Sequence, residues 1–358
     1  MYQALGITAL TAPQAAVAFG ALLGLAFGLL AERTGFCLRR SVVAGPERRT
    51  AAGVWLAGVA AALVGTQAAV AAGWIGFGDH RFHAGDLPVA AIAVGGALFG
   101  AGMVLTRGCI SRLVVLSGTG NLRAALVILV FALTALATIR GVLAPLRLWL
   151  GEATLPLGAA ASLGGWPGGA LLWTALGAGA ALAVAARSGA GRGKLAGAAA
   201  LGLLVPLGWV GTGLVLQDDF DPVAMQSLAF TSSAAEALFW VGAATSIPLS
   251  FGAGLVGGAV LGAFASAGTA GRLRWQSFES PGQTGRYLSG AVLMGPGGTL
   301  AGGCTVGAGL SGTATLSVGA LLALAAMVAA GVATDRALSR SSRESGARGR
   351  TPAPRPAE

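Results

Sequence analysis

Long apolar stretches recur from one end of this sequence to the other, and they constrain its fold more than any other feature. Nine of them lie at about 15–31, 51–75, 88–105, 123–143, 168–186, 195–216, 245–268, 286–301 and 314–333. A helix of about 20 apolar residues crosses the hydrocarbon core of a bilayer. Only 10% of the 358 residues are charged, against about 25% in soluble domains. The sequence therefore predicts an all-α, polytopic membrane protein with about nine transmembrane helices, and it excludes a soluble enzyme, a secreted disulfide scaffold and a disordered chain.

The charges between these segments predict the orientation of the chain. Basic clusters follow the first, fifth and seventh segments and fill the C-terminal tail, whereas the other gaps are acidic or mixed. Because Lys and Arg stay on the cytoplasmic side, we expect a plasma (inner) membrane protein with its N-terminus outside and its C-terminus in the cytoplasm. No Lys or Arg precedes Arg33, so the first segment lacks the basic start of a cleavable signal peptide. Residues 339–358 are expected to form a disordered, basic cytoplasmic tail.

Two stretches of the sequence match each other. Residues 95–119 are GGALFGAGMVLTRGCISRLVVLSGT, and residues 290–313 are GAVLMGPGGTLAGGCTVGAGLSGT. The two copies share their glycines, one Cys and a final LSGT. The charge-derived topology gives them opposite orientations, which is the inverted-repeat plan of many transporters. We expect one membrane domain, 1–338, in a 4+1+4 arrangement: repeat one at about 15–143, a linker helix at about 168–186 and repeat two at about 195–333.

Each copy contains a break, where Gly and Cys interrupt the apolar run about ten residues before the next run begins. Irregular backbone at membrane depth must be packed in protein or line a cavity. We therefore expect 106–119 and 300–313 to be re-entrant or discontinuous segments that meet near the midplane. A third such segment is predicted at 35–44, and its repeat partner, 225–239, has no Cys.

Two further glycine series have a different explanation. Gly20, Gly24 and Gly28 are spaced four residues apart, as are the glycines at 254, 258 and 262. Glycine at this spacing lets two helices approach closely in a membrane. It predicts packing and requires no function.

The polar residues exclude several kinds of site. The two histidines, His80 and His83, share one loop. The acidic residues lie near the ends of the apolar segments, and Glu236 is the only one placed to lie deeper in the membrane. This distribution argues against haem ligation, proton coupling and transport of metals by hard ligands. No Ser-His-Asp set, phosphate-cradling loop or metal-binding CxxC occurs. We therefore expect no enzyme activity, no metal site, no cofactor and no nucleic-acid partner.

Three cysteines remain: Cys37, Cys109 and Cys304. A lone buried Cys usually acts as a small hydrophobe, but each of these lies in a Gly-flanked break and two occupy equivalent repeat positions. A thiol in a dry, apolar site stays uncharged and offers a weak S–H donor, which suits brief binding of a sulfur-rich anion. Several weak sites in series favour conduction. The alternative is a thiol-disulfide enzyme in which Cys109 and Cys304, the two at equivalent repeat positions, converge and form a disulfide.

Positive charge accompanies two of the cysteines. Arg39 and Arg40 follow the first, and Arg107 and Arg112 flank the second. The breaks also create helix N-termini, whose positive dipole ends attract anions. Anchoring at the cytoplasmic face is the alternative role of these arginines. Together these features indicate a small anion with a soft sulfur that passes along a path lined by thiols.

These residues resemble the YeeE/YedE family of sulfur-compound permeases, whose studied members take up thiosulfate. The similarity rests on GFCLRRS around Cys37, LTRGC ending at Cys109 and GPGGTLAGGCTVG with its LSGT sequel around Cys304, and it extends over most of 15–333. It implies an hourglass-shaped helical protein and a thiosulfate path in which the three cysteines relay the ion by transient S–H···S contacts. We expect six residues to support this path: Arg39, Arg107, Gly108, Arg112, Gly303 and Thr305.

Alternatives follow from the same resemblance. Some members of this broad family are linked to selenium or to other sulfur compounds, so the transported species is open among these. Some relatives work with a small cytoplasmic sulfur-carrier protein, which is a candidate partner beside the anion and the lipid bilayer. A structural or assembly subunit that transports nothing is a third kind of function.

Overall fold

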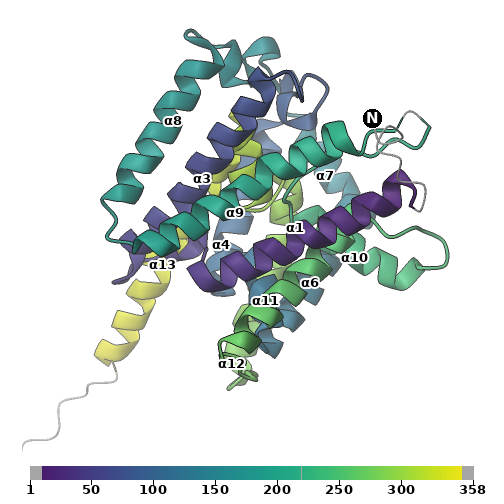
Figure 1. The fold of residues 1–358 in the computed structure, drawn as a ribbon. Helices are drawn as coiled ribbons and strands as arrows, with labels where there is room; N and C mark the ends of the chain where they lie inside the picture. Colours follow the sequence, from purple (N-terminus) through teal and green to yellow (C-terminus); the bar gives the residue numbers. More distant parts are fainter. Residues whose placement is uncertain (1–9, 219, 349–358) are drawn as a thin grey trace, which may run out of the picture.

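The computed structural model describes residues 10–218 and 220–348, and nearly all of its regular structure is helical (Figure 1). The α-helices are α1 (Ala12–Thr34), α2 (Leu38–Val42), α3 (Arg48–Ala71), α4 (Val89–Leu105), α5 (Ile110–Gly118), α6 (Leu122–Arg140), α7 (Ala144–Gly151), α8 (Gly169–Ala186), α9 (Arg192–Val210), α10 (Thr231–Ala243), α11 (Phe251–Thr269), α12 (Pro281–Leu300) and α13 (Val318–Arg348). Two-residue strands β1 (Asp86–Leu87) and β2 (Leu155–Pro156) pair antiparallel. The shorter helical segments are η2 (Arg81–His83), η3 (Gly158–Ala161), η4 (Leu163–Gly165), η5 (Gly211–Val215), η6 (Gly307–Gly312) and η7 (Thr313–Thr315), of which η5 and η6 are π-helical.

Eight stretches of the described residues are helical, apolar and long enough to cross a membrane. They are 12–42, 48–71, 89–118, 122–140, 169–186, 192–215, 251–269 and 318–340. The prediction of a helical, multi-pass membrane protein is therefore confirmed, but the predicted number of nine spans is not. The remaining predicted segment, 286–301, lies in α12, which is not apolar enough to count among them because Gln283, Thr284 and Arg286 occupy its first turns.

Glycine brings α1 and α11 into direct contact. A Cβ on Gly24 would lie 2.1 Å from the Leu255 carbonyl oxygen, and one on Gly258 would lie 2.0 Å from that of Ala21. Only glycine permits so close an approach of two helix backbones. The packing role predicted for the two glycine series is confirmed, and the two helices run side by side (Figure 1).

The other long helices surround a common core. Helix α3 packs along α9 and α8, α4 packs on α12 and α13, and α6 packs on α12. One cluster of buried apolar side chains includes members from α1 to α13. Helix α8 lies at the edge of the molecule (Figure 1), where only Ala178, Ala181 and Ala185 are buried.

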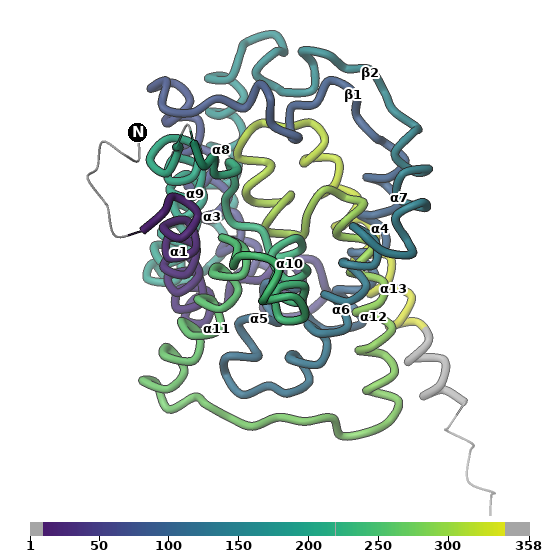
Figure 2. The backbone as a smooth tube through the Cα atoms, turned by 90° about the vertical axis from the view of Figure 1, so that its right-hand side faces the viewer, coloured from purple at the N-terminus to yellow at the C-terminus, as the bar shows by residue number. Residues whose placement is uncertain are grey.

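The molecule has two distinct ends (Figure 2). We call one the β-strand end, since β1 and β2 pair there. We call the other the α2 end. There the Ala44 N–H donates to the Asp335 carboxylate of α13 over 3.0 Å, and loop 270–280 joins α11 to α12 across the bottom of Figure 2.

The basic tail, 339–358, stays a prediction. Helix α13 continues to Arg348. No proline interrupts the helix before Pro352 in the sequence, and proline is the residue that most strongly ends a helix. The rest of the predicted tail, 349–358, lies outside the described residues.

Candidate functional site

Each cysteine lies where a short helical segment begins. Cys37 is the N-cap residue of α2, and Cys109 is the N-cap residue of α5. Cys304 lies shortly before η6. Their exposed fractions are 3%, 1% and 0%, respectively, and all three are free thiols. The three breaks therefore carry their thiols into the protein interior and not onto its outer surface.

Cys109 is the central member of the three. Its side chain lies next to that of Cys37, and its Sγ lies 3.3 Å from the Ser111 Oγ. Cys304 is close enough to Cys109 for the two groups to interact electrostatically. Cys109 thus lies next to Cys37 and within electrostatic range of Cys304, which gives the order Cys304, Cys109, Cys37. The thiol pair in direct contact is Cys37 with Cys109, whereas the sequence had favoured Cys109 with Cys304 for a redox pair.

The immediate neighbours of the thiols are polar backbone and hydroxyl groups. The Gly307 N–H donates to the Cys304 Sγ over 3.3 Å. Thr305, which is fully buried, has its side chain next to Cys109. Its Oγ1 has no hydrogen-bond partner of good geometry among the described residues. The predicted association of Thr305 with the cysteines is thus a feature of the structure.

The predicted arginines gather at the α2 end of the thiol series. Arg112 lies near Cys37, and its Nη1 donates to the Ala31 carbonyl at the end of α1 over 3.4 Å. Arg39 lies near Cys37 and Arg107, and its Nε is buried without a hydrogen-bond partner in the described structure. The thiol series is therefore flanked by positive charge at this end.

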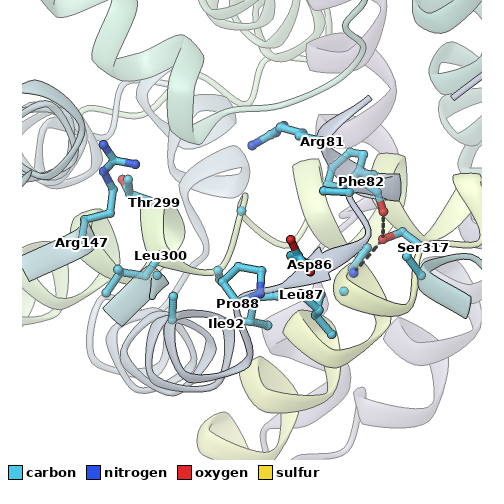
Figure 3. Close-up of a pocket in the computed structure, with 18 residues that line it drawn as sticks. Arg81, Phe82, Asp86, Leu87, Pro88, Ile92, Arg147, Thr299, Leu300 and Ser317 are labelled. Atoms are coloured by element: carbon cyan, nitrogen blue, oxygen red, sulfur yellow. Dashed lines mark hydrogen bonds between the residues drawn. The ribbon is translucent and has the colours of Figure 1, made fainter. Parts of the chain in front are cut away.

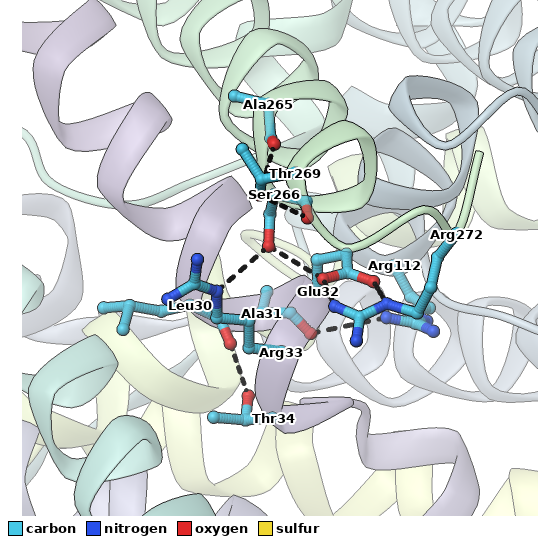
Figure 4. Close-up of polar contacts among 10 residues, drawn as sticks. All are labelled: Leu30, Ala31, Glu32, Arg33, Thr34, Arg112, Ala265, Ser266, Thr269 and Arg272. Carbon is cyan, nitrogen blue, oxygen red and sulfur yellow. Dashed lines mark hydrogen bonds and ion pairs between the residues drawn. The ribbon is translucent and has the colours of Figure 1, made fainter.

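A polar network fixes the end of α1 just before Cys37 (Figure 4). The Glu32 carboxylate accepts from the Arg272 Nε over 3.0 Å and from the Ser266 Oγ over 2.8 Å. Because Arg112 binds the same helix end, charges from α5 and from loop 270–280 both position the residues that lead into Cys37.

The two glycines predicted to support the path differ in backbone conformation and in the space around them. Gly303 has a φ of 155°, and a Cβ on it would lie 2.7 Å from the Ala308 backbone nitrogen. Gly108 has no positive φ, and a Cβ on it would meet nothing closer than 3.5 Å. The second break thus requires glycine at this position, and the first does not.

Two adjoining cavities open at the β-strand end, and their charge was missed in the sequence. Their volumes are about 250 and 280 Å3. Arg81 of η2, Arg147 of α7 and Thr299 of α12 line both of them (Figure 3). The second cavity also reaches Gly303, the residue before Cys304. The second cavity therefore ends at the residue next to Cys304, and none of the three cysteines lines either cavity.

Both cavity arginines are available to an anion. The Arg147 Nε donates to the Thr138 carbonyl over 3.2 Å, which leaves its two Nη groups for other partners. Neither Arg81 nor Arg147 forms an ion pair in the part of the chain that the structure describes. The Arg81 side chain is exposed, and a guanidinium stays charged at neutral pH.

The loop that carries Arg81 is fastened to the second break. The His83 Nε2 lies 2.9 Å from the Thr315 carbonyl oxygen, and the Ser317 Oγ donates to the Phe82 carbonyl over 2.6 Å. Arg81 was overlooked because its loop has mixed charge. The positive-inside rule offered a clue, since an arginine kept on the predicted outer side is unusual.

The chain belongs to the sulphur-transport family. The family model described as "Sulphur transport" matches residues 33–334, a range that contains Cys37, Cys109 and Cys304. The resemblance to the YeeE/YedE family that the motifs indicated is therefore confirmed. A search of curated proteins finds no match. The family and the eight candidate spans together describe a multi-pass membrane transporter of sulfur compounds.

Proposed function

We propose that this chain takes up thiosulfate, or a closely related sulfur oxyanion, through a path lined by Cys304, Cys109 and Cys37. The observation that carries the proposal is the contact order of three buried thiols that begins beside a cationic cavity. A lone buried cysteine needs no function, but a series of three, each at a break in a helix, is difficult to explain by packing alone.

The cavity at the β-strand end captures the anion. Arg81 and Arg147 line both cavities and Asp86 lines only the first, so the second cavity contains two positive charges and no carboxylate from the described residues. Such a recess concentrates a dianion and speeds its association. The predicted orientation, with the N-terminus outside, makes this the external face.

The thiols then hold the anion weakly in turn. An uncharged thiol is a poor donor and a poor acceptor, so each contact is short-lived, and a series of weak sites favours passage over trapping. The Gly307 N–H already donates to the Cys304 sulfur, which leaves the S–H proton for the passing ion. Cys37 and Cys109 stand at the starts of α2 and α5, where backbone dipoles favour negative charge.

The arginines of the α2 end receive the anion after Cys37. Arg39 and Arg112 lie near this thiol and Arg107 lies near Arg39, and the predicted topology makes this the cytoplasmic side. Positive charge at each end of the uncharged thiol series lowers the electrostatic energy of the dianion before it enters the series and after it leaves.

Helix packing supports the inverted repeat that we include in this proposal. If α1 corresponds to α9 and α3 to α11, the pairing of α1 with α11 has its counterpart in that of α9 with α3. If α4 corresponds to α12 and α6 to α13, the pairing of α4 with α13 has its counterpart in that of α12 with α6. Two such halves place two equivalent breaks at the centre of one path.

Growth of a bacterium that lacks thiosulfate uptake, with thiosulfate as the sulfur source, tests this function. The wild-type chain should restore growth, and Cys109→Ala should abolish it at equal membrane abundance. Ser111→Ala, which alters the neighbour of the same sulfur but keeps all three thiols, is the matched control and should grow. Normal growth of Cys109→Ala would reject the thiol path.

The contact between Cys37 and Cys109 also favours a second function, thiol-disulfide exchange. That function requires the pair to form a disulfide in the working protein. Thiol labelling after mild oxidation, followed by mass spectrometry, separates the two proposals. A transporter should keep uptake only in the reduced form, whereas an exchange enzyme should cycle between the two forms.

A further inference from the structure

Two threonine hydroxyls on the proposed path lack hydrogen-bond partners. Thr231 is 4% exposed and Thr305 is 0% exposed. Neither Oγ1 has a partner of good geometry among the described residues. Burying a hydroxyl without a partner costs free energy, and most buried polar atoms in native proteins are satisfied. Two such atoms at the same site indicate a ligand that satisfies them.

Other buried threonines of this chain show the usual arrangement. Thr106, Thr138 and Thr212 each donate to the carbonyl four residues earlier, at distances of 2.9, 2.8 and 2.9 Å. This bond is common for Thr in a helix. Thr231 begins α10, and Thr305 lies in a break, so neither has a preceding helical turn to accept from it.

The two hydroxyls lie at successive levels of the path. Thr231 lines the cavity that contains Arg81 and Arg147 and that reaches Gly303. Its Oγ1 lies 2.9 Å from where a Cβ on Gly298 would stand, so glycine in α12 leaves room at this hydroxyl. Thr305 follows Cys304 in the chain and faces Cys109. Each hydroxyl is thus next to a group already assigned to the anion.

Thiosulfate needs two kinds of partner, because one end is a soft sulfur and the other carries three oxygens. A thiol suits the soft end. A hydroxyl is a stronger donor and suits a charged oxygen. We infer that Thr231 and Thr305 bind the oxygen-bearing end of the anion while the cysteines hold its sulfur, which makes these two threonines determinants of specificity. The inference rests on the proposed function.

Selection against hydrosulfide follows from this assignment. Hydrosulfide has a soft sulfur but no oxygen, so it would pass the thiols and leave both hydroxyls unpaired. Sites built to hydrogen-bond a substrate discriminate strongly against an analogue that lacks the bonding group. Sulfate satisfies the hydroxyls but offers no soft sulfur. The path should therefore prefer anions that carry both.

The test compares Thr231→Val and Thr305→Val, which remove the hydroxyl and nearly keep the shape, with Thr231→Ser and Thr305→Ser, which keep the hydroxyl. Thr66→Val is the matched control. Thr66 of α3 is also fully buried with an unpartnered Oγ1 among the described residues, but, unlike Thr231, it lines neither cavity and, unlike Thr305, it is not among the neighbours of Cys109. The readout is uptake of radiolabelled thiosulfate by proteoliposomes, with hydrosulfide and sulfate as competitors.

We expect each valine variant to raise the thiosulfate KM about tenfold and to weaken the discrimination against hydrosulfide, which should then compete more effectively with thiosulfate. The serine variants should recover the wild-type KM, and Thr66→Val should match the wild type. An unchanged KM in both valine variants, with an active wild type, would overturn the inference and leave the proposed function intact. An inactive wild type would instead reject the proposed function. If a valine variant fails to accumulate, the serine variant decides, because a KM raised despite the retained hydroxyl contradicts the inference.

Discussion

The two breaks of this transporter share a bend but differ in charge and burial. Arg107, Gly108 and Cys109 in the first align with Gly302, Gly303 and Cys304 in the second. The bend begins at the same aligned position, because Arg107 has a φ of 59° and Gly302 a φ of 75°. After the bend, the first copy forms α5, and the second forms η6, in which every residue is buried.

Under the proposed function, this difference assigns different parts of the path to the two breaks. The first break keeps an exposed arginine in a left-handed conformation, which costs a non-glycine residue about 1–2 kcal/mol. Its neighbours are the arginines of the α2 end. The second break has no charged residue in its turn and lies against the loop that carries Arg81. One break therefore serves the cationic α2 end, and the other forms the uncharged interior next to the cavity.

The largest asymmetry is expected from alanine at the two aligned glycines. Gly303→Ala should destabilise the folded protein by at least about 2 kcal/mol, because its positive φ and its contact with the Ala308 nitrogen both exclude a side chain. Gly108→Ala should change stability by no more than about 0.5 kcal/mol. Thermal unfolding of the purified protein in detergent measures both. Equal losses of stability in the two variants would contradict the difference between the two breaks.

The next largest effect is expected at the cavity. Arg81→Gln and Arg147→Gln should each lower kcat/KM for thiosulfate about fivefold to tenfold, mainly by raising KM. The reason is that, in the proposed function, the two arginines capture the dianion before it reaches the thiols. The effect should shrink at high salt, since ions screen exposed charges. Arg48→Gln, an exposed arginine of α3 outside these cavities, is the control. A lower kcat with an unchanged KM would place these arginines at a later step.

Substitutions at the shared bend, at Arg107 and Gly302, should change the stability of the protein and its transport rate in different ways. Arg107→Gly should stabilise the fold by about 1 kcal/mol, because glycine adopts a left-handed conformation without strain. The same change should slow uptake, because it removes a cation of the α2 end. Gly302→Ala should cost a similar amount of stability. Thermal unfolding and uptake measured on the same preparations check both expectations, and a variant that is more stable with full uptake would remove Arg107 from the path.

Acid should affect the surroundings of the second break and not those of the first, which is the smallest effect we expect. Burial, with Arg81 and His83 nearby, lowers the pKa of His80 to about 4 from its usual 6.5. The folded state thus favours the neutral ring, whose Nδ1 accepts from the Phe82 N–H over 3.2 Å. The stability that this provides is present above pH 6.5 and is lost as the pH falls toward 4.

Hydrogen exchange of the loop around His80, followed between pH 6.5 and 4 with correction for intrinsic rates, measures this effect. Protection should fall there and remain in α5. His80→Phe should abolish the pH dependence. Protection lost equally at both breaks would show that the acid effect is global.

The sequence predicted the parts of the fold that depend on local pattern. Apolar length predicted the helices, glycine spacing predicted the contact of α1 with α11, and the Gly-Cys interruptions predicted the breaks. Eight of the nine predicted segments are candidate spans by length and composition, and the ninth, α12, is less apolar because its first turns are polar yet packs within the bundle. Its helix depends on packing against α4 and α6, and no window of the sequence contains that information.

The candidate site was likewise predictable only where it depends on local sequence pattern. The cysteines stood out because they are few and lie at interruptions, but their order of contact depends on how separate breaks meet in space. Arg81 and Arg147 are distant in sequence and become neighbours only through η2 and α7. The unpartnered hydroxyls of Thr231 and Thr305 could not be predicted, because a missing hydrogen bond is a property of the folded surroundings.

The most direct test of the thiol path is the rate at which proteoliposomes accumulate radiolabelled thiosulfate. Vesicles with the wild-type chain should accumulate it, and vesicles with Cys304→Ala, matched for protein content, should accumulate no more than empty vesicles do. Wild-type rates in the Cys304→Ala vesicles would contradict the account, because the anion would then cross without the first thiol of the series.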